Sequence, residues 1–266
     1  MTRGTCLWPC GPADPAAVST QRVPLYLSPE HQCSYLPRRR AVNAFVDPRI
    51  AMTPQRYEAL LLNGFRRSGP YVYRPMCEHC SACRSARVPV AKFRMRRWQR
   101  RIWRRNADLA VVLRPPAFNP EHFALYQRYL LARHNDGEMD PHDRHAYMHF
   151  LTCAWMDTAF VEFRLHGRLA AVAAVDVLPA SLSAVYTFFH PALHHRSLGT
   201  YAILWQIGEA ERRGLTHVYL GYWVQDSPKM HYKINFAPID ILRDGRWQRV
   251  NAPDSGVERR LKSADN

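Results

Sequence analysis

The stretch TAFVEFRLHGRLAAVAAVDV, residues Thr158–Val177, decides how this chain folds. Apolar and polar residues alternate along Thr158–Leu165, as they do in a β-strand with one buried face. His166-Gly167 supplies a tight turn, and Arg168–Val177 then reads as a second, largely apolar strand. The stretch therefore predicts a β-hairpin.

The residues that follow extend this hairpin into a larger unit. Leu182–Phe189 is a third predicted strand, Leu198–Arg213 is a predicted helix closed by Gly214, and His217–Gly221 is a further strand. An antiparallel meander, crossed by a helix and followed by a parallel strand, resembles the acetyltransferase-like (GNAT) α/β fold. We therefore expect an α/β (α+β) protein with a GNAT-like C-terminal domain.

The residues before the hairpin predict two helices and a separate small unit. Glu121–Arg133 and His142–Cys153 have helical spacing, and a third helix begins at Pro54 with Thr53 as its N-cap. Short extended segments surround that third helix: Pro24–Leu27, Val42–Val46, Tyr71–Tyr73 and Val88–Phe93. The expected division is a flexible N-terminus (1–20), a cysteine-containing domain (21–110), a GNAT-like domain (111–250) and a flexible tail (251–266).

Composition limits the possible functions. The chain has 266 residues, 47% of them apolar, which is enough to bury a core. Its 37 Lys and Arg residues against 22 Asp and Glu give a net charge of +15, which favours an anionic partner, most often a nucleic acid. The apolar runs are too short to span a bilayer and no secretory signal is visible, so we expect a cytoplasmic protein without a membrane partner.

Positive charge is concentrated in Ala91–Arg105, AKFRMRRWQRRIWRR, which has eight cations and no acid. Phe93, Trp98 and Trp103 are interleaved with the basic residues. Such a segment could follow a phosphate backbone while bases stack on its indoles. The alternative is a solvated helix face with Trp98 and Trp103 anchored in the core.

Cysteine spacing predicts a possible metal or cluster site. Cys77-Glu-His-Cys80-Ser-Ala-Cys83 contains two consecutive Cys-x-x-Cys steps, which let neighbouring thiolates converge on one metal. Cys33 is the leading fourth ligand, and His79 competes with it. We expect Arg84 and Arg87 to lower the thiol pKa values and favour thiolates. The alternative is a loop of free or packed thiols.

Two further segments carry chemistry. Arg196 to Tyr201 begins a predicted helix, where backbone amides and Arg196 could bind an anion, although Tyr201 stands where coenzyme A enzymes have a small residue. A simple capped helix would explain the same residues. At helical spacing, Lys229, Tyr232 and Lys233 would share one face beside a pocket, unless they are exposed residues of a surface helix.

Together, several motifs resemble those of the N-end-rule aminoacyl-tRNA-protein transferases. They are Cys33-Ser-Tyr-Leu-Pro, Tyr73-Arg-Pro-x-Cys77-x-x-Cys80-x-x-Cys83, Arg87-Val-Pro-Val, Arg196-Ser-Leu-Gly-Thr-Tyr201, Tyr219-Leu-Gly-Tyr-Trp223 and Lys229-Met-x-Tyr-Lys233-x-x-Phe236-x-Pro238. The resemblance covers Pro24 to Leu242 and is to the short bacterial branch, the aspartate/glutamate leucyltransferases. The chain departs from it at Arg38-Arg39 and Gln225-Asp226, both expected in loops.

The resemblance implies transfer of leucine from leucyl-tRNA to proteins that begin with Asp or Glu, which marks them for degradation. It needs no cofactor for transfer, although an iron–sulfur cluster or zinc at Cys33, Cys77, Cys80 and Cys83 is compatible with it. Partners would be leucyl-tRNA and acidic N-termini, and we expect a monomer. The expected catalytic residues are Lys229, Tyr232, Lys233 and Asp176. Arg84 and Arg87 would bind the acidic N-terminus, and the tRNA and its aminoacyl group would contact Arg97, Arg100, Arg101, Arg196, Gly199, Tyr222 and Trp223.

Two hypotheses from other classes explain part of the same sequence. An acetyl-CoA-dependent N-acetyltransferase would share the fold, and it requires coenzyme A to bind at Arg196–Tyr201. A non-catalytic, metal-dependent nucleic-acid-binding protein would explain the charge and the cysteines, but it leaves the Lys229–Pro238 motif without a purpose.

Overall fold

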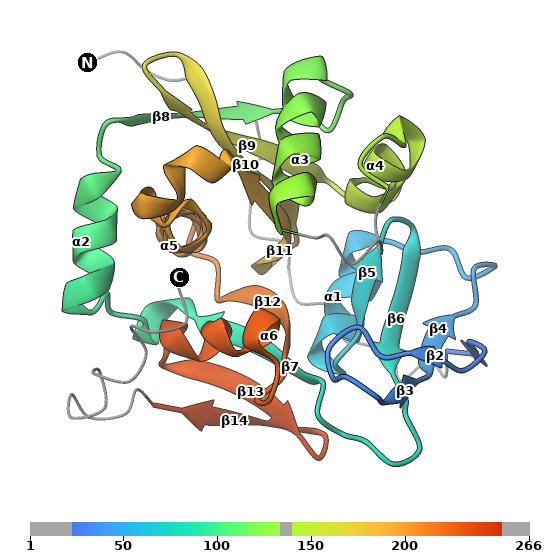
Figure 1. The fold of residues 1–266 in the computed structure, drawn as a ribbon. Coiled ribbons are helices and arrows are strands. Elements are labelled where there is room, and N and C mark those ends of the chain that lie inside the picture. The colour runs from blue at the N-terminus through green and yellow to red at the C-terminus, as the bar shows by residue number, and fades with distance from the viewer. Residues whose placement is uncertain (1–22, 134–139, 252–266) are drawn as a thin grey trace.

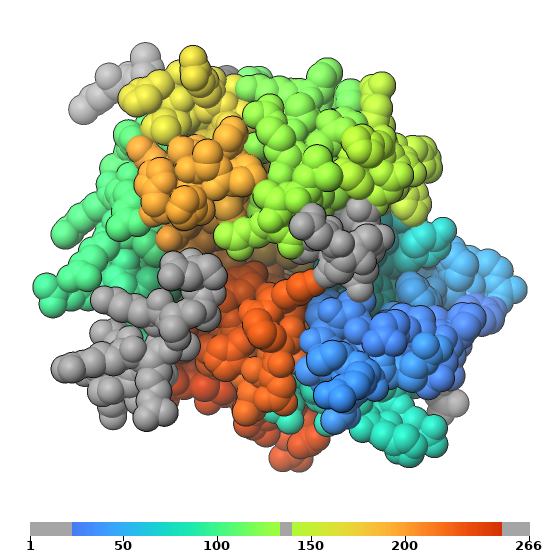
Figure 2. Space-filling model, viewed as in Figure 1, coloured from blue at the N-terminus to red at the C-terminus, as the bar shows by residue number. Residues whose placement is uncertain are grey.

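The computed structural model describes residues 23–133 and 140–251. The flexible N-terminus predicted for residues 1–20 and nearly all of the predicted tail lie outside the described residues. The described part forms a small antiparallel sheet with one helix and a large mixed sheet covered by helices (Figure 1). Figure 2 shows the N-terminal residues (blue) lying directly against residues close to 230 (orange).

The small sheet has the strand order β1-β4-β6-β5 and is antiparallel throughout. Its strands are β1 Leu25–Leu27, β4 Asn43–Val46, β6 Tyr71–Pro75 and β5 Arg66–Ser68, and a separate two-stranded ribbon joins β2 His31–Gln32 to β3 Arg40–Ala41. Helix α1 (Pro54–Leu62) begins as predicted, with the Thr53 side chain accepting a hydrogen bond from the Arg56 amide. Its buried Tyr57 and Leu61 pack against Val72 of β6.

The large sheet has eight strands in the order β14-β13-β7-β12-β11-β10-β9-β8. They are β14 Arg246–Val250, β13 Ile239–Arg243, β7 Arg84–Pro89, β12 His217–Trp223, β11 Ser181–Phe189, β10 Arg168–Val177, β9 Thr158–Leu165 and β8 Leu109–Arg114. The predicted hairpin is confirmed, because β9 and β10 pair antiparallel from Arg168 opposite Leu165 to Asp176 opposite Thr158. Arg168, next to the turn, is exposed, whereas the apolar residues behind it are buried.

Alternation along these strands supplies a core on both faces of the sheet. Val161 and Ala173 belong to the core cluster that includes residues of helix α5 (Leu198–Arg212), and Phe160 and Val172 belong to the other. That second cluster includes residues of α3 (Pro120–Arg133) and α4 (Arg144–Leu151), which lie on the side of the sheet away from α5 (Figure 1). Because helices cover both faces of the sheet, β10 is apolar at nearly every position.

The predicted acetyltransferase-like arrangement is confirmed by the strand pairing. Strands β9, β10 and β11 form the antiparallel meander, α5 follows after the 3-10 turn η2 (Pro191–Arg196), and β12 then returns parallel to β11. The protein thus has a small N-terminal domain and a GNAT-like C-terminal domain. The helix predicted at His142–Cys153 is shorter than expected, because the Asp143 side chain caps it and Arg144 is its first residue.

Strand β7 joins the two parts of the chain. It lies between β12 and β13, and it is followed by the 3-10 turn η1 (Val90–Lys92) and by helix α2 (Arg97–Arg105). The extended segment predicted at Val88–Phe93 is therefore wrong beyond Pro89, where the chain turns. The sheet runs across the predicted domain division at residues 110 and 111, and that division stays a prediction. Within the ranges that the structure describes, no helix is long and apolar enough to cross a membrane.

Candidate active site

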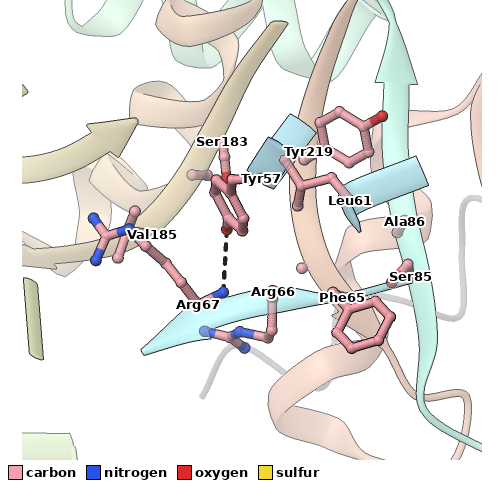
Figure 3. Close-up of a pocket in the computed structure, with 12 residues that line it drawn as sticks. Tyr57, Leu61, Phe65, Arg66, Arg67, Ser85, Ala86, Ser183, Val185 and Tyr219 are labelled. Atoms are coloured by element: carbon pink, nitrogen blue, oxygen red, sulfur yellow. Dashed lines mark hydrogen bonds between the residues drawn. The ribbon is translucent and has the colours of Figure 1, made fainter. Parts of the chain in front are cut away.

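Strands β11 and β12 pair over only three positions and then part. Their parallel register runs from Ser181 opposite His217 to Ser183 opposite Tyr219. Just beyond, the pairing of β12 with β7 shifts between Tyr219 and Gly221, and Gly221 has a φ of +72°. A pocket lined by Ser183, Val185, Tyr219 and Gly221 lies at this bulge, where β11 and β12 part (Figure 3).

Strand β5 of the N-terminal sheet places two consecutive arginines at this pocket. Because side chains alternate along a strand, Arg66 and Arg67 point to opposite faces. Figure 3 shows both extending from β5, with the Arg67 amide hydrogen-bonded to the Tyr57 hydroxyl at 3.1 Å. Arg67 is 2% exposed and is bound by Asp176, whereas Arg66 is half-buried.

Arg66 faces aromatic rings instead of an acid. Its guanidinium carbon lies 5.9 Å from the centre of the Tyr73 ring and 5.7 Å from that of Tyr222. Among residues 23–133 and 140–251, no carboxylate pairs with it. A half-buried guanidinium without a counter-ion is an attractive partner for a ligand carboxylate or phosphate, which it can bind through two hydrogen bonds.

Lys233 approaches the same point from the 3-10 turn η3 (Tyr232–Phe236). It is 5% exposed, and its Nζ donates to the Tyr222 carbonyl oxygen at 2.5 Å. A Cβ atom added at Gly221 would lie 3.6 Å from Arg66 Nη1 and 3.9 Å from Lys233 Nζ, so both basic side chains converge on this glycine. Burial and the Arg66 charge lower the pKa of Lys233 well below its usual value, against an opposing effect of Cys83.

The other residues of the predicted catalytic motif do not share a face with Lys233. Lys229, on helix α6 (Pro228–His231), is exposed, and Tyr232 is 43% exposed. The expectation of one common face is wrong, because the chain tightens from an α-turn into a 3-10 turn between Lys229 and Lys233. Of these three residues, only Lys233 lies close to Gly221 of β12.

Tyr222 and Trp223, predicted to line the aminoacyl site, are both buried. The Tyr222 hydroxyl donates to the carbonyl oxygens of Gly64 (3.1 Å) and Tyr73 (3.2 Å), which fixes the N-terminal sheet to β12. Burial raises its pKa well above the usual value, so it stays a neutral donor. Its ring forms one wall around Arg66, whereas the Trp223 indole N–H is buried without a partner among the described residues.

Asp176 is used inside the protein. It is 0% exposed, and its two oxygens accept hydrogen bonds from Arg67 at 2.5 and 2.7 Å and from the Thr158 hydroxyl at 2.8 Å. This is the geometry of a structural ion pair that joins the two sheets. Asp176 could orient an incoming amine only if that pair separated.

The two arginines predicted to bind an acidic N-terminus have different surroundings. Arg87 stacks on Trp247 at 4.1 Å, donates to the Tyr219 hydroxyl at 3.2 Å and lies 3.6 Å from Asp240. Its charge is therefore already satisfied within the protein. Arg84 is half-buried at the start of β7, directly after Cys83, and no hydrogen bond or ion pair holds it in the described part of the chain.

The anion site predicted at the start of α5 is also internally neutralised. Arg196 binds both oxygens of Asp108, at 2.8 and 3.0 Å. Ser197, the N-cap residue, has a left-handed backbone and makes no side-chain cap, and Gly199 packs close to Phe189. The side chain expected to bind a phosphate is thus held by a carboxylate far away in the sequence.

Helix α2 carries the predicted basic surface. Arg97, Arg100 and Arg101 are exposed, as expected for phosphate contacts. Trp98 and Trp103 are half-buried and pack against the core, with the Trp103 ring centre 5.3 Å from that of Tyr201 of α5. This favours the alternative of indoles anchored in the core, and base stacking on them stays a prediction. The buried Gln99 donates to the Asn235 carbonyl oxygen at 3.1 Å, which ties α2 to the turn that holds Lys233.

The four cysteines gather around one cavity of about 130 Å³, which Tyr35, Tyr73 and Tyr222 also line. They are Cys33, Cys77, Cys80 and Cys83, all half-buried and free. Burial, together with the other three thiols, raises the pKa of Cys83 to about 12, so the expectation that nearby arginines favour its thiolate is wrong. In residues 23–133 and 140–251 no three His, Cys, Asp or Glu side chains are placed to hold a metal, and the metal assignment stays a prediction.

The arrangement also contains residues that the sequence analysis missed. Arg66, Tyr35 and Tyr73 surround the convergence point, and burial raises the pKa of Tyr35 to about 12. The available signal was the pair Arg66-Arg67 directly after apolar Phe65, since adjacent arginines on a strand must face different surroundings. Gln99 had no signal beyond its position in the basic segment.

An acetyltransferase-like sheet whose parallel strands part at a pocket lined by arginines and tyrosines is an arrangement suited to a group-transfer enzyme. The chain belongs to the arginine-tRNA-protein transferase family. The N-terminal part of that family, described as "Arginine-tRNA-protein transferase, N terminus", matches residues 31–101, and its C-terminal part matches residues 121–243. The protein is therefore a transferase, and the hypothesis of a non-catalytic binding protein is wrong.

Its relatives are named "Aspartate/glutamate leucyltransferase". One from Pseudomonas aeruginosa (strain LESB58) is 51% identical over 226 residues, 85% of this chain and 96% of the relative. One from Nitrosococcus oceani is 53% identical over 224 residues, 84% of this chain and 94% of the relative. Among solved structures, L-PGS from Bacillus licheniformis is 12% identical, with a TM-score of 0.42 over 54% of this chain and 46% of that one.

Proposed function

We propose that this protein transfers leucine from leucyl-tRNA to the α-amine of proteins that begin with aspartate or glutamate. The names and identities of its relatives support the donor and the acceptor. The structural observation that carries the proposal is Arg66, a half-buried guanidinium with no carboxylate partner in the described ranges, beside the buried Lys233. A substrate carboxylate supplies the counter-ion that Arg66 lacks.

In this proposal the acidic side chain of the acceptor binds Arg66, in place of the predicted Arg84 or Arg87. The fixed, planar fork of the guanidinium matches a carboxylate and discriminates against an amide or an alkyl side chain. The α-amine is then held close to Gly221 and Lys233, because Arg66 and Lys233 converge there. Positioning of this kind is the main requirement when the acyl donor is already activated.

The reaction is aminolysis of an ester. The amine nitrogen attacks the leucyl carbonyl carbon, a C–N bond forms and the C–O bond to the tRNA ribose breaks. The electron pair stays on the ribose oxygen, which takes up the proton that the amine loses. Lys233 Nζ donates to the developing oxyanion.

The exposed arginines of α2 bind tRNA phosphates in this scheme, next to the turn that carries Lys233. Charged tRNA is a substrate found in the cytoplasm, which is where we propose that the protein acts, as a monomer. We do not propose acetyl-CoA as a donor, since Arg196 is paired with Asp108 and Tyr201 occupies the position of a small residue.

The test uses peptides that begin with Asp, Glu or Lys, incubated with the protein and with tRNA charged with leucine or arginine. Mass spectrometry is expected to show one added leucine on the Asp and Glu peptides only. Addition of arginine, or addition to the Lys peptide, would contradict the proposed specificity. No addition from either tRNA would contradict the transfer itself.

A further inference from the structure

The N-terminal sheet has one face packed on α1 and a second face rich in aromatic rings. Ala44, Val46 and Val72 are buried, and alternation places Phe45, Tyr71 and Tyr73 on the opposite face. Tyr26 of β1 joins them, because it lies directly opposite Phe45 in the strand register. We call the side chains of Tyr26, Phe45, Tyr71 and Tyr73 the aromatic face.

Two of these rings are open to solvent. Tyr26 is 50% exposed and Tyr71 is 49% exposed, although large aromatic side chains account for much of the burial in most cores. No hydrogen bond holds the Tyr71 hydroxyl in the described residues. Tyr26 and Tyr71 lie on either side of Phe45 of β4, and a contiguous aromatic surface that stays exposed is typical of a binding site.

The rings form a connected path that leads to the candidate active site. Phe45 lies 6.5 Å from Tyr71 and 5.4 Å from Tyr73, measured between ring centres. Tyr73 in turn lies 6.5 Å from Tyr222, and the Arg66 guanidinium carbon lies 5.9 and 5.7 Å from these two rings. At the outer end the path reaches α4, where His149 lies 5.8 Å from Tyr71.

Arginines flank the aromatic face on two sides. Arg66 stands at the end next to Tyr222, and Arg49 donates to the hydroxyl of Tyr26, on the edge strand β1, at 2.6 Å. Arg49 also forms an ion pair with Asp47 at 2.7 Å, the carboxylate that contacts Tyr26, so these two charges offset each other and Arg66 is the arginine beside the aromatic face without a carboxylate in the described residues. Rings that can stack bases, with arginines beside them, form the surface that proteins present to single-stranded nucleic acid.

We infer that the aromatic face binds the unpaired 3′ end of the tRNA substrate by stacking its bases. Since the path ends at Arg66, beside Lys233, a strand stacked on it delivers its terminal ribose ester to the point where these two side chains converge. The inference rests on the proposed function, because it takes tRNA to be the donor. In this inference the N-terminal sheet stacks bases and α2 binds phosphates. The exposed side chains of α2 are arginines, whereas its indoles pack against the core.

The test measures binding of two uncharged RNA hairpins with the tRNA acceptor stem, one with the unpaired 3′ end and one blunt. In fluorescence anisotropy at fixed salt, wild-type protein is expected to bind the blunt hairpin at least about tenfold more weakly. Tyr71→Leu, alone and combined with Phe45→Leu, is expected to reduce or remove this difference and to leave blunt-hairpin affinity unchanged.

Tyr71→Phe is the matched control, because it keeps the ring and removes only the hydroxyl, and it should bind both hairpins as the wild type does. Leu131→Ala, at an exposed position of α3, controls for loss of surface apolar area. Circular dichroism melting curves show whether each variant is folded.

An unchanged 3′-end effect in the folded leucine variants would overturn the inference. The inference would also be overturned if the leucine variants kept the 3′-end effect but bound an Asp-starting peptide more weakly. The aromatic face would then bind the protein substrate and not the tRNA. The hairpins carry no amino acid, so this result does not depend on leucine transfer. Failure of the mass-spectrometry test with normal 3′-end binding would contradict the proposed function alone.

Discussion

Arg67 and Asp176 form a two-point ion pair in the protein interior, with Nη2 2.5 Å from Oδ1 and Nε 2.7 Å from Oδ2. Arg67 belongs to the N-terminal sheet and Asp176 to the eight-stranded one. Arg67 also donates to the Leu151 carbonyl oxygen at 2.8 Å, at the end of α4. The pair fixes β5 against the large sheet, and it thereby fixes the position of Arg66, the preceding residue of the strand.

We predict that Asp176→Ala lowers the free energy of unfolding by about 3–5 kcal/mol, because it leaves the Arg67 guanidinium buried without its counter-ion. Urea unfolding followed by circular dichroism measures this change. The double variant Arg67→Met, Asp176→Leu should recover much of the loss, because neither charge then remains. If Asp176→Ala were as stable as the wild type but inactive, Asp176 would act in the reaction and not in the fold.

Substitution of Arg66 tests the acceptor site. We expect Arg66→Met to raise the KM for an Asp-starting peptide about tenfold to a hundredfold, the cost of losing a charge-assisted hydrogen bond. Arg66→Lys should recover only part of this, since an ammonium lacks the planar fork. Arg74→Met, on the neighbouring strand with its guanidinium over Phe65, is the matched control. An unchanged KM in Arg66→Met would place the acidic side chain elsewhere.

Gly221 has a left-handed backbone that disfavours any Cβ, so Gly221→Ala should destabilise the fold by about 1–2 kcal/mol. It should also lower transfer strongly, because the bulge sets the positions of Arg66 and Lys233. Gly167→Ala, at the turn between β9 and β10, is the control. Gly167 has a φ of +79°, so the backbone cost is the same, and no atom lies within 4 Å of the added Cβ. Comparing the thermal midpoint and the transfer rate of the two variants separates the effects. Equal losses of activity would mean that the bulge does not shape the site.

Lys233→Met should make the protein more stable and less active. The folded-state pKa of Lys233 is lowered, so between that pKa and the unfolded pKa of about 10.4 the unfolded chain binds a proton that the folded protein lacks. Wild-type stability therefore rises with pH in that window, whereas the methionine variant has no such contribution. Urea unfolding at pH 7 and pH 9 should show the stability advantage of Lys233→Met shrinking as pH rises. A constant advantage would mean that Lys233 is charged in the folded protein.

The arginines of α2 should contribute to tRNA affinity without regard to sequence. Replacing Arg97, Arg100 and Arg101 with Gln should weaken binding of every tRNA and reduce the slope of log affinity against log salt, by about 0.9 for each phosphate that the helix no longer neutralises. Arg168→Gln, at the exposed start of β10, is the matched control. A salt slope that stays the same in the triple variant would show that tRNA phosphates do not bind this helix.

Local patterns in the sequence were sufficient to predict most elements of this fold. Thr53 and Pro54 set the start of α1, and His166-Gly167 set the ends of β9 and β10, because caps and turns depend on residues that are adjacent in the chain. The parallel pairing of β12 with β11 could be predicted because a helix, α5, lies between these two strands in the sequence. Each of these signals lies within the element that it defines.

The site could be predicted only in part, because the relevant partners are distant in the sequence. Arg196 reads as an anion-binding residue until Asp108, 88 positions away, is seen to hold it. Arg87 is satisfied by Tyr219, 132 positions away. For Arg66 the reverse holds: the sequence does not single it out, yet in the structure it has no carboxylate partner among the described residues. The buried Asp176 pairs with the neighbouring Arg67, and Arg66 lies against aromatic rings.

The position of β7 in the sheet also has a consequence for biosynthesis. This strand is made early, yet both of its neighbours, β12 and β13, are made near the end of the chain. While the ribosome is still translating residues before 217, β7 has neither edge paired, and neither Gly221 nor Lys233 exists to face Arg66. The full pairing of β7 and the completion of the pocket therefore come only after residue 233 has been made, although β8 to β11 can pair earlier, and a chain terminated before that point lacks the candidate site.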